Sequence, residues 1–478
     1  MRRLSAAPLA FVFLAGCAVG PNYKRPEVTT PAQFRAQVSP AQAASLADRP
    51  WWEIFDDKTL ASLIDEALRN NYDLRAAGWR VEEARAVAGI ARSEFYPQVQ
   101  LAAGWSRSQF PSTTGGTSYE PVSLYDVNLG LSWELDIWGR IRRLDEAALA
   151  QYLASEEARR GVMLSLVADV ATSYFELRRL DLQLEIAKRT AAAFEQTRDL
   201  FDRRFAAGAA SALETASAEA SLAATSATIP ALERQITAQE NQLSLLLGRD
   251  PGDVPRGAAL NDQRLLPEIP PGIPSDLLER RPDVRAAEQA LIAANATVGV
   301  ATANMFPTIS LTGAFGGVAP QVSELFGTGK TWSVGGGLLT PIVQGGRLAD
   351  ARRAAVAQWQ QVRLAYERTV TNAFGEVSTA LVAYGKLAQV EGQLERAVAA
   401  DRTAVQLANQ RYVGGLADYL EVLQAEQQLF PAEIALAQSR FDRLATLVQL
   451  YKALGGGWKL PDQEWSGHAQ ESVGEQQR

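Results

Sequence analysis

The chain of 478 residues carries 47 lysine and arginine side chains against 54 aspartate and glutamate side chains, which gives a formal net charge of −7. The two signs are interspersed, which argues against nucleic acid as a partner. The single cysteine and the single histidine, His468, exclude a disulfide, a histidine-based catalytic triad and a zinc site built from histidines and cysteines. The sequence contains neither a P-loop nor a dinucleotide-binding glycine motif. We therefore expect no enzyme, no cofactor and no metal site.

The first 16 residues have the pattern of an export signal peptide. Two arginines precede an apolar stretch, residues 6–15, that is too short to span a membrane as a helix. The stretch ends in Leu14-Ala15-Gly16-Cys17, which resembles a bacterial lipobox and implies cleavage before Cys17 and lipidation of that cysteine. An ordinary signal peptide with an incidental cysteine is the alternative. Ala18 stands where lipoproteins of the inner membrane usually have aspartate, so the pattern indicates the outer membrane.

Residues 17–50 are rich in proline, alanine, glutamine and threonine, which predicts an extended linker after the lipid anchor. Trp51 opens the folded part, and an apolar stripe with helical spacing runs from Leu60 toward Ile90. Beyond the linker we expect a first repeat over 51–250, an equatorial connector over 251–280, a second repeat over 281–456 and a partly disordered tail over 457–478.

After Pro97 the apolar period changes from 3.6 to 2, which is typical of strands. The alternation predicts two strands within residues 95–137 and two more within 305–341. Acidic residues (Asp126, Glu134, Asp136) share one face. Such strands form either a half-buried sheet on a soluble core or transmembrane strands that are apolar toward lipid and polar toward a lumen. Their length of about ten residues and the aromatic residues near their ends favour the second interpretation.

Four strands are too few to close a transmembrane barrel, because known spanning barrels begin at about eight strands. The subunits must therefore pool their strands. This predicts an obligate ring-shaped oligomer that leaves few strand edges exposed.

Very long helices follow each strand pair. Residues 139–206 and 346–413 contain no proline, and roughly 68 residues of helix span about 100 Å at 1.5 Å per residue. Returning helices are expected over 211–247 and 418–454. Helices of this length indicate coiled-coil or tubular packing.

The sequence also repeats itself. Gly139-Arg140 recurs as Gly346-Arg347, and Leu247-Gly248 recurs as Leu454-Gly455, each at an offset of 207 residues (346 − 139 and 454 − 247). A period this long indicates two copies of one large strand and helix module rather than a short solenoid unit.

The two turns between the long and the returning helices are the candidate functional positions. Each long helix ends in an aromatic residue followed by glycine, in Phe205…Gly208 and in Tyr412…Gly414-Gly415. The next helix begins with Ser211-x-x-Glu214, a capping box, or with Asp418-x-x-Glu421, a close relative of one. Helix capping alone explains these residues, so any further functional role has to be weighed against it.

Several motifs, taken in order over nearly the whole chain, resemble the TolC-like outer-membrane efflux channel family. The match is to its NodT/OprM-type lipoprotein branch, from tripartite, RND-type efflux pumps. The motifs are Cys17-Ala-Val-Gly-Pro-Asn-Tyr-Lys-Arg-Pro26, Trp51-Trp52…Phe55, Arg280-Arg-Pro-Asp-Val-Arg-Ala-Ala-Glu288, Ala303-Asn-Met-Phe-Pro307 and Arg411-Tyr412…Gly415…Glu421-Val-Leu-Gln-Ala425.

The resemblance implies a mainly α fold with β strands, assembled as a homotrimer. Each chain would give four strands to a 12-stranded transmembrane β-barrel and its helices to a periplasmic α-helical barrel. A mixed equatorial belt would use residues 51–75, 249–280 and 455–465.

The resemblance also implies roles for the tips. They would close the periplasmic mouth and dock onto a periplasmic adapter (membrane fusion) protein. The implied contact residues are Arg204, Gly208, Arg411, Gly414 and Gly415, and the implied aperture residues are Asp418, Glu421 and the first-repeat counterpart Glu214. Gln424 stands where some relatives carry a second acid, which leaves the charge of the mouth open.

The function implied is a passive conduit in the outer membrane that exports small molecules, such as drugs and toxic compounds, and is gated at its helix tips. An inner-membrane transporter would supply the energy, and outer-membrane lipid would surround the strands. The alternatives are a periplasmic adapter lipoprotein and a structural coiled-coil lipoprotein. Two hairpins and four alternating segments favour the channel, because adapters usually have one hairpin and a scaffold needs no strands.

Overall fold

The computed structural model describes residues 18–35, 45–109, 121–266, 269–461 and 465. Two compact units contain these residues. Unit 1 comprises residues up to 27, 80–155 and 286–366, and unit 2 comprises 28–79, 156–285 and 367–478. Among the described residues, no helix combines the length and the apolar character that crossing a membrane requires.

The duplication in the sequence is a duplication of elements. The helices pair by equal length: α3 (Tyr72–Ser93) and α7 (Pro282–Ala303) have 22 residues, α4 (Arg140–Ala206) and α8 (Arg347–Val413) have 67, and α5 (Ala212–Leu246) and α9 (Tyr419–Ala453) have 35. Both ends of α4 and α5 recur in α8 and α9 at the offset of 207 residues that the sequence predicts. The two modules are therefore copies of one fold.

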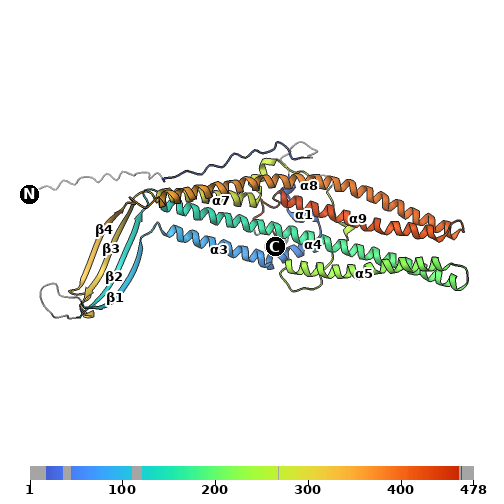
Figure 1. Ribbon diagram of the computed structural model, residues 1–478, viewed down its shortest axis with the longest axis horizontal. Coiled ribbons are helices and arrows are strands. Elements are labelled where there is room, and N and C mark those ends of the chain that lie inside the picture. The colour runs from blue at the N-terminus through green and yellow to red at the C-terminus, as the bar shows by residue number, and fades with distance from the viewer. Residues whose placement is uncertain (1–17, 36–44, 110–120, 267–268, 462–464, 466–478) are drawn as a thin grey trace, which may run out of the picture. The chain divides into compact units, whose positions relative to one another are not determined.

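Unit 1 contains one antiparallel sheet in the order β1-β2-β3-β4, with neighbouring strands side by side (Figure 1). The strands are β1 (Gln98–Ser108), β2 (Val122–Leu135), β3 (Thr308–Ala319) and β4 (Lys330–Leu339). The central pair joins the two repeats, with Leu129 opposite Phe315. Large apolar side chains on the strands are exposed, including Leu101, Trp105, Phe315 and Trp332. The interpretation as a sheet packed on a soluble core therefore does not fit, because along β1 and β4 residues of both faces are exposed among the residues that the structure describes.

Two of the acidic residues expected on one strand face, Glu134 and Asp136, bind groups at the start of α4. Glu134 forms a bidentate ion pair with Arg140, with Nε to Oε1 at 2.8 Å. Asp136 lies beyond the end of β2 and accepts the backbone amides of Ile141 and Arg142 at 2.9 Å, so it stabilises the first turn of α4. The expectation that Asp136 continues the strand is wrong, because capping the following helix satisfies amides that would otherwise have no partner.

The first described residues are fixed to unit 1. The amide of Val19 donates to the carbonyl of Trp138 at 3.0 Å, directly before α4. Asn295 on α7 donates to the carbonyl of Pro21 at 2.9 Å. Arg25 forms a bidentate ion pair with Glu288 at 2.6 Å. The chain that follows Cys17 is thus held near the junction of strand β2 and helix α4.

Unit 2 contains α5 and α9 with the parts of α4 and α8 that start at residues 156 and 367, and these form two antiparallel helical hairpins, α4 with α5 and α8 with α9 (Figure 1). The apolar stripe from Leu60 toward Ile90 does not form one helix. It divides into α2 (Lys58–Asn70) and α3, because the side chain of Asn71 accepts the amide of Leu74 and donates to the carbonyl of Leu246. That pair of bonds starts a new helix and ties it to the end of α5.

The core of unit 2 lies where short elements pack against the hairpins. These elements are η1 (Leu46–Asp48), α1 (Trp51–Phe55), η2 (Leu260–Asp262), η3 (Pro274–Asp276) and α6 (Leu277–Arg280); η4 (Val322–Glu324) belongs to unit 1. Trp51, Phe55, Phe175 and Tyr451 are among the buried side chains of this core. The indole of Trp51 donates to the carbonyl of Trp465 at 3.1 Å. Parts of the three segments predicted to form a belt thus lie in one cluster.

One buried carboxylate organises this core. Asp57 is 8% exposed, and its Oδ1 accepts two backbone amides of the first turn of α2. Its Oδ2 accepts the hydroxyl of Tyr174 at 3.0 Å, the side-chain amide of Gln263 at 2.8 Å and the backbone amide of Ala258 at 3.2 Å. One side chain therefore connects α2, α4 and the connector, and burial in contact with Asp57 raises the pKa of the Tyr174 hydroxyl.

Candidate functional site

The candidate site consists of the two hairpin tips. Each long helix ends on a glycine with a left-handed backbone, Gly208 at φ +70° and Gly415 at φ +69°. The amide of the residue after each glycine closes the turn, with Ala209 donating to the carbonyl of Arg204 and Leu416 donating to the carbonyl of Arg411, both at 2.8 Å. Only glycine adopts this conformation without strain, so the turn geometry explains these glycines.

The first tip forms the predicted capping box. The hydroxyl of Ser211 accepts the amide of Glu214 at 3.2 Å, and a carboxylate oxygen of Glu214 accepts the amide of Ser211 at 2.7 Å. Hydrogen bonding from Ser211 lowers the pKa of Glu214. Glu214 is thus engaged with its own helix end.

The second tip is built differently. Asp418 is the N-cap residue of α9, but its side chain makes no capping hydrogen bond. The carboxylate of Glu421 instead pairs with Arg411 of the preceding helix, with Nε to Oε2 at 3.2 Å. The reciprocal bond of a capping box, from the Asp418 amide to the Glu421 carboxylate, is therefore not formed, because this carboxylate pairs with Arg411. Capping alone does not account for Asp418.

The two tips contact each other. Arg204 at the first tip lies over the ring of Tyr412 at the second, 5.3 Å from its centroid, and donates to its hydroxyl. Phe201 packs on Tyr419 with ring centroids 4.6 Å apart, and the hydroxyl of Tyr419 donates to Thr197 at 2.8 Å. These aromatic residues belong to a small buried cluster that joins the hairpins. By contrast, the bond of Arg203 among the described residues stays within its own helix, to the carbonyl of Asp199.

Sequence reasoning missed Tyr419, Phe201 and Thr197. One signal could have pointed to Tyr419: it directly follows the cap residue Asp418, and the other tip also carries aromatic residues. Which of those aromatic residues meet depends on how the hairpins pack, and no spacing in the sequence expresses that. Cys17, the predicted lipidation site, and His468 lie outside the described residues.

The motif Arg280-Arg-Pro-Asp-Val-Arg lies away from the tips, at the start of α7. Arg281 is 7% exposed and pairs with Asp283 at 2.6 Å and with Glu376 on α8 at 2.7 Å. It also donates to the carbonyl of Ala453, the last residue of α9. The motif thus links the helix ends of the second repeat and has no direct part in the tips.

Comparison with known proteins agrees with this arrangement. The family model described as outer membrane efflux protein matches residues 63–249 and 273–456, one match for each repeat. The chain belongs to the outer membrane efflux protein family. Its members are channels rather than enzymes, and the family places this protein in the outer membrane.

Individual relatives are similar over almost the full length. A probable efflux pump outer membrane protein of Pseudomonas putida, TtgC, is 36% identical, with 95% of each chain covered. The outer membrane protein OprJ of Pseudomonas aeruginosa is 37% identical, also with 95% of each covered.

Solved structures of outer-membrane channels are similar in fold as well. The channel OprN aligns with a TM-score of 0.86 at 34% identity, over 92% of this chain and all of that one. The open state of the MtrE channel of Neisseria gonorrhoeae aligns with a TM-score of 0.84 at 34% identity, over 94% of this chain and all of that one. The efflux protein is therefore an outer-membrane channel component, and the alternatives of an adapter or a scaffold are not favoured.

Proposed function

We propose that three copies of this efflux protein form one channel, with their strands pooled into a 12-stranded barrel and their hairpins into a periplasmic tube. The observation that carries the proposal is the four-stranded sheet of unit 1. Its outer strands, β1 and β4, each pair on one side only among the described residues, and large apolar side chains on its strands are exposed. Neighbouring copies would supply the missing partners for the edge strands.

The proposed cargo is small organic molecules. Relatives are named for the efflux of toluene, solvents and antibiotics. A transporter in the inner membrane and a periplasmic adapter protein would deliver the cargo, and the channel itself would act passively. The adapter would dock at the tips around Arg204, Gly208, Arg411, Gly414 and Gly415.

The tips would also act as the gate. The Arg204–Tyr412 and Arg411–Glu421 contacts would hold the closed form, and three copies of Asp418 and Glu421 would surround the aperture. The equivalent acid of the first repeat, Glu214, would only cap its helix, because both capping bonds to Ser211 are formed.

The test of the channel is the mass and the activity of the purified protein. We expect a trimer in non-ionic detergent that migrates differently on gels before and after heating, and restored drug resistance when the gene complements a strain lacking its own outer-membrane efflux protein. A monomer without channel activity in planar bilayers would contradict the proposal.

A second prediction concerns the anchor. Cys17→Ser is expected to abolish incorporation of radiolabelled palmitate, because the thiol that would carry the acyl chain is gone. The attachment of residues 19–25 to unit 1 would still place the chain start at the junction of β2 and α4. We therefore expect trimers to form in the variant, while labelling of the wild-type protein is retained. A wild-type protein that takes up no label would show that the signal peptide is an ordinary one.

A further inference from the structure

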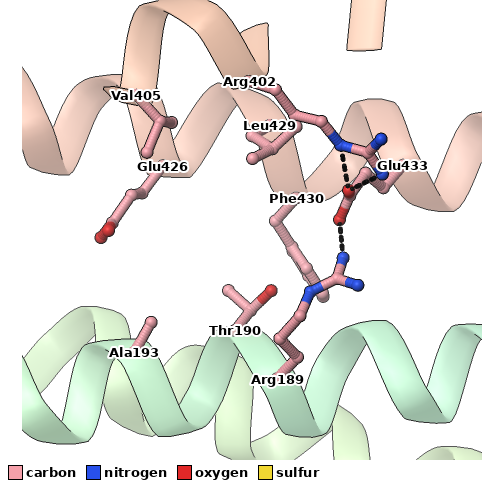
Figure 2. Close-up of a pocket in the computed structure, with 9 residues that line it drawn as sticks. All are labelled: Arg189, Thr190, Ala193, Arg402, Val405, Glu426, Leu429, Phe430 and Glu433. Carbon is pink, nitrogen blue, oxygen red and sulfur yellow. Dashed lines mark hydrogen bonds and ion pairs between the residues drawn. The ribbon is translucent and has the colours of Figure 1, made fainter. Parts of the chain in front are cut away.

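A pocket of about 320 Å³ lies in unit 2 between α4, α8 and α9, away from the tips (Figure 2). Much of its wall is apolar, with Ala193 from α4, Val405 from α8, and Leu429 and Phe430 from α9. This volume is at the lower end of the range for sites that bind small organic molecules, and such sites combine apolar walls with a few polar groups.

Three charged residues lie together at one side of the pocket, two arginines and one glutamate, with a net charge of +1. Glu433 has a side chain that is 5% exposed, and it accepts hydrogen bonds from both Arg189 and Arg402. The guanidinium of Arg402 lies at 2.7 Å from Oε1 of Glu433. Figure 2 shows both arginines directed at this one carboxylate. Both guanidinium groups are therefore bound to Glu433, which balances one of their two positive charges.

Glu426 on α9 is the remaining acidic residue of the pocket. Its Oε2 atom is buried and has no hydrogen-bond partner among the described residues. Figure 2 shows its side chain extending from α9 toward α4, on the side away from the two guanidinium groups. Burial raises the pKa of this carboxyl. A buried carboxylate without a partner is costly, and a cation placed beside it would remove that cost.

We propose that this pocket binds a lipophilic organic cation, with the positive charge against the Glu426 carboxylate and the apolar part against Leu429, Phe430 and Ala193. The aromatic ring of Phe430 suits such a ligand, because cations are attracted to the face of an aromatic ring. The pocket would be a binding site for cationic cargo within the packed helical hairpins. The proposal deepens the proposed export function and rests on it.

The charge on Glu426 gives the site a pH dependence. A cation binds the ionised carboxylate, so binding weakens as the pH falls through the raised pKa and strengthens above it. The other charged groups that line the pocket are Arg189, Arg402 and Glu433, and Tyr419 on α9 also lies near this carboxylate. The hydroxyl of Tyr419 stays protonated, because burial raises its pKa.

The experiment measures ethidium, a permanent aromatic cation whose fluorescence rises when it leaves water, on the purified full-length protein in non-ionic detergent. Glu426→Gln keeps the shape and removes the charge, and we expect it to weaken ethidium binding about tenfold. It should leave the binding of the neutral probe 1-N-phenylnaphthylamine unchanged, and it should abolish the pH dependence. Ala193→Phe fills the pocket while Glu426 stays, and it should weaken ethidium binding as well.

Glu219→Gln is the matched control. It removes one carboxylate from α5, where the side chain is 58% exposed and lines no part of this pocket. We expect ethidium binding to match that of the wild-type protein. Equal ethidium binding by the wild-type protein and Glu426→Gln would overturn the inference, as would a loss of binding in Glu426→Gln that Ala193→Phe does not reproduce.

These measurements separate the inference from the proposed function. Trimer mass and the export of neutral compounds are recorded for every variant. A trimer that exports neutral compounds but binds ethidium equally well without Glu426 contradicts the cation site alone. A wild-type protein that stays monomeric and exports nothing contradicts the channel, whatever its affinity for ethidium.

Discussion

Replacing Asp57 by alanine is expected to lower the free energy of unfolding of the protein by about 4 kcal/mol. The substitution removes the cap of α2 and leaves the hydroxyl of Tyr174 and the side-chain amide of Gln263 without their buried acceptor. A lost cap contributes about 1 kcal/mol, and each buried donor that loses a charged acceptor contributes about 1 to 3 kcal/mol.

Thermal unfolding followed by circular dichroism at 222 nm checks this prediction, because the helices dominate that signal. Asp57→Asn keeps an acceptor for the cap but loses the charge, and we expect an intermediate decrease in the unfolding temperature. Glu53→Ala removes an exposed carboxylate from the neighbouring α1 and should change it little. A decrease for Asp57→Ala no larger than that for Glu53→Ala would mean that the Asp57 cluster is not required.

The double variant Arg204→Ala with Arg411→Ala is expected to raise the passive conductance of the channel about 100-fold. It removes the contact of Arg204 with Tyr412 and the ion pair of Arg411 with Glu421. Each contact is solvent-exposed and contributes about 0.5 kcal/mol after screening. Six such contacts in a trimer amount to about 3 kcal/mol, which shifts a closed–open equilibrium by about two powers of ten.

Planar bilayer recordings measure this conductance directly, and uptake of a large antibiotic by intact cells provides a second readout. Arg203→Ala is the matched control, because that arginine is adjacent and equally charged, but its bond among the described residues stays within its own helix, to the carbonyl of Asp199. We expect wild-type conductance from it. An equal increase in conductance from Arg203→Ala would indicate a general effect of charge at the mouth. If the double variant shows no increase in conductance, these contacts do not hold the channel closed.

Most of the fold was accessible from local patterns. The change of apolar period from 3.6 to 2 after Pro97 and the glycines at 208 and 415 mark strands and turns through properties of single residues and their neighbours. The two returning helices were predicted although each contains a proline. Pro230 lies within α5 and Pro431 within α9, and both helices continue through them. Proline costs a helix one backbone hydrogen bond, which packing along a 35-residue helix offsets.

The candidate site could be predicted from the sequence only in part. The residues Ser211 and Glu214 form the box that their spacing predicts, because a capping box involves four consecutive positions of one chain segment. Asp418 and Glu421 have the same spacing but form no box, because the Glu421 carboxylate pairs with Arg411, ten residues earlier. The spacing of Asp418 and Glu421 alone cannot predict that a residue from another helix will pair with the carboxylate.

The sequence by itself determined the two repeats, their strands and long helices, and the turns that end those helices, because periodicity and backbone preference act over a few residues. The tertiary structure alone decided which side chains meet across helices: Tyr412 with Arg204 at the tips and Asp57 with Tyr174 in the core. It also left Oε2 of Glu426 without a hydrogen-bond partner among the described residues. These pairings depend on the rotation and register of helices packed side by side. Residues more than 100 positions apart come within hydrogen-bond distance only once that packing is complete.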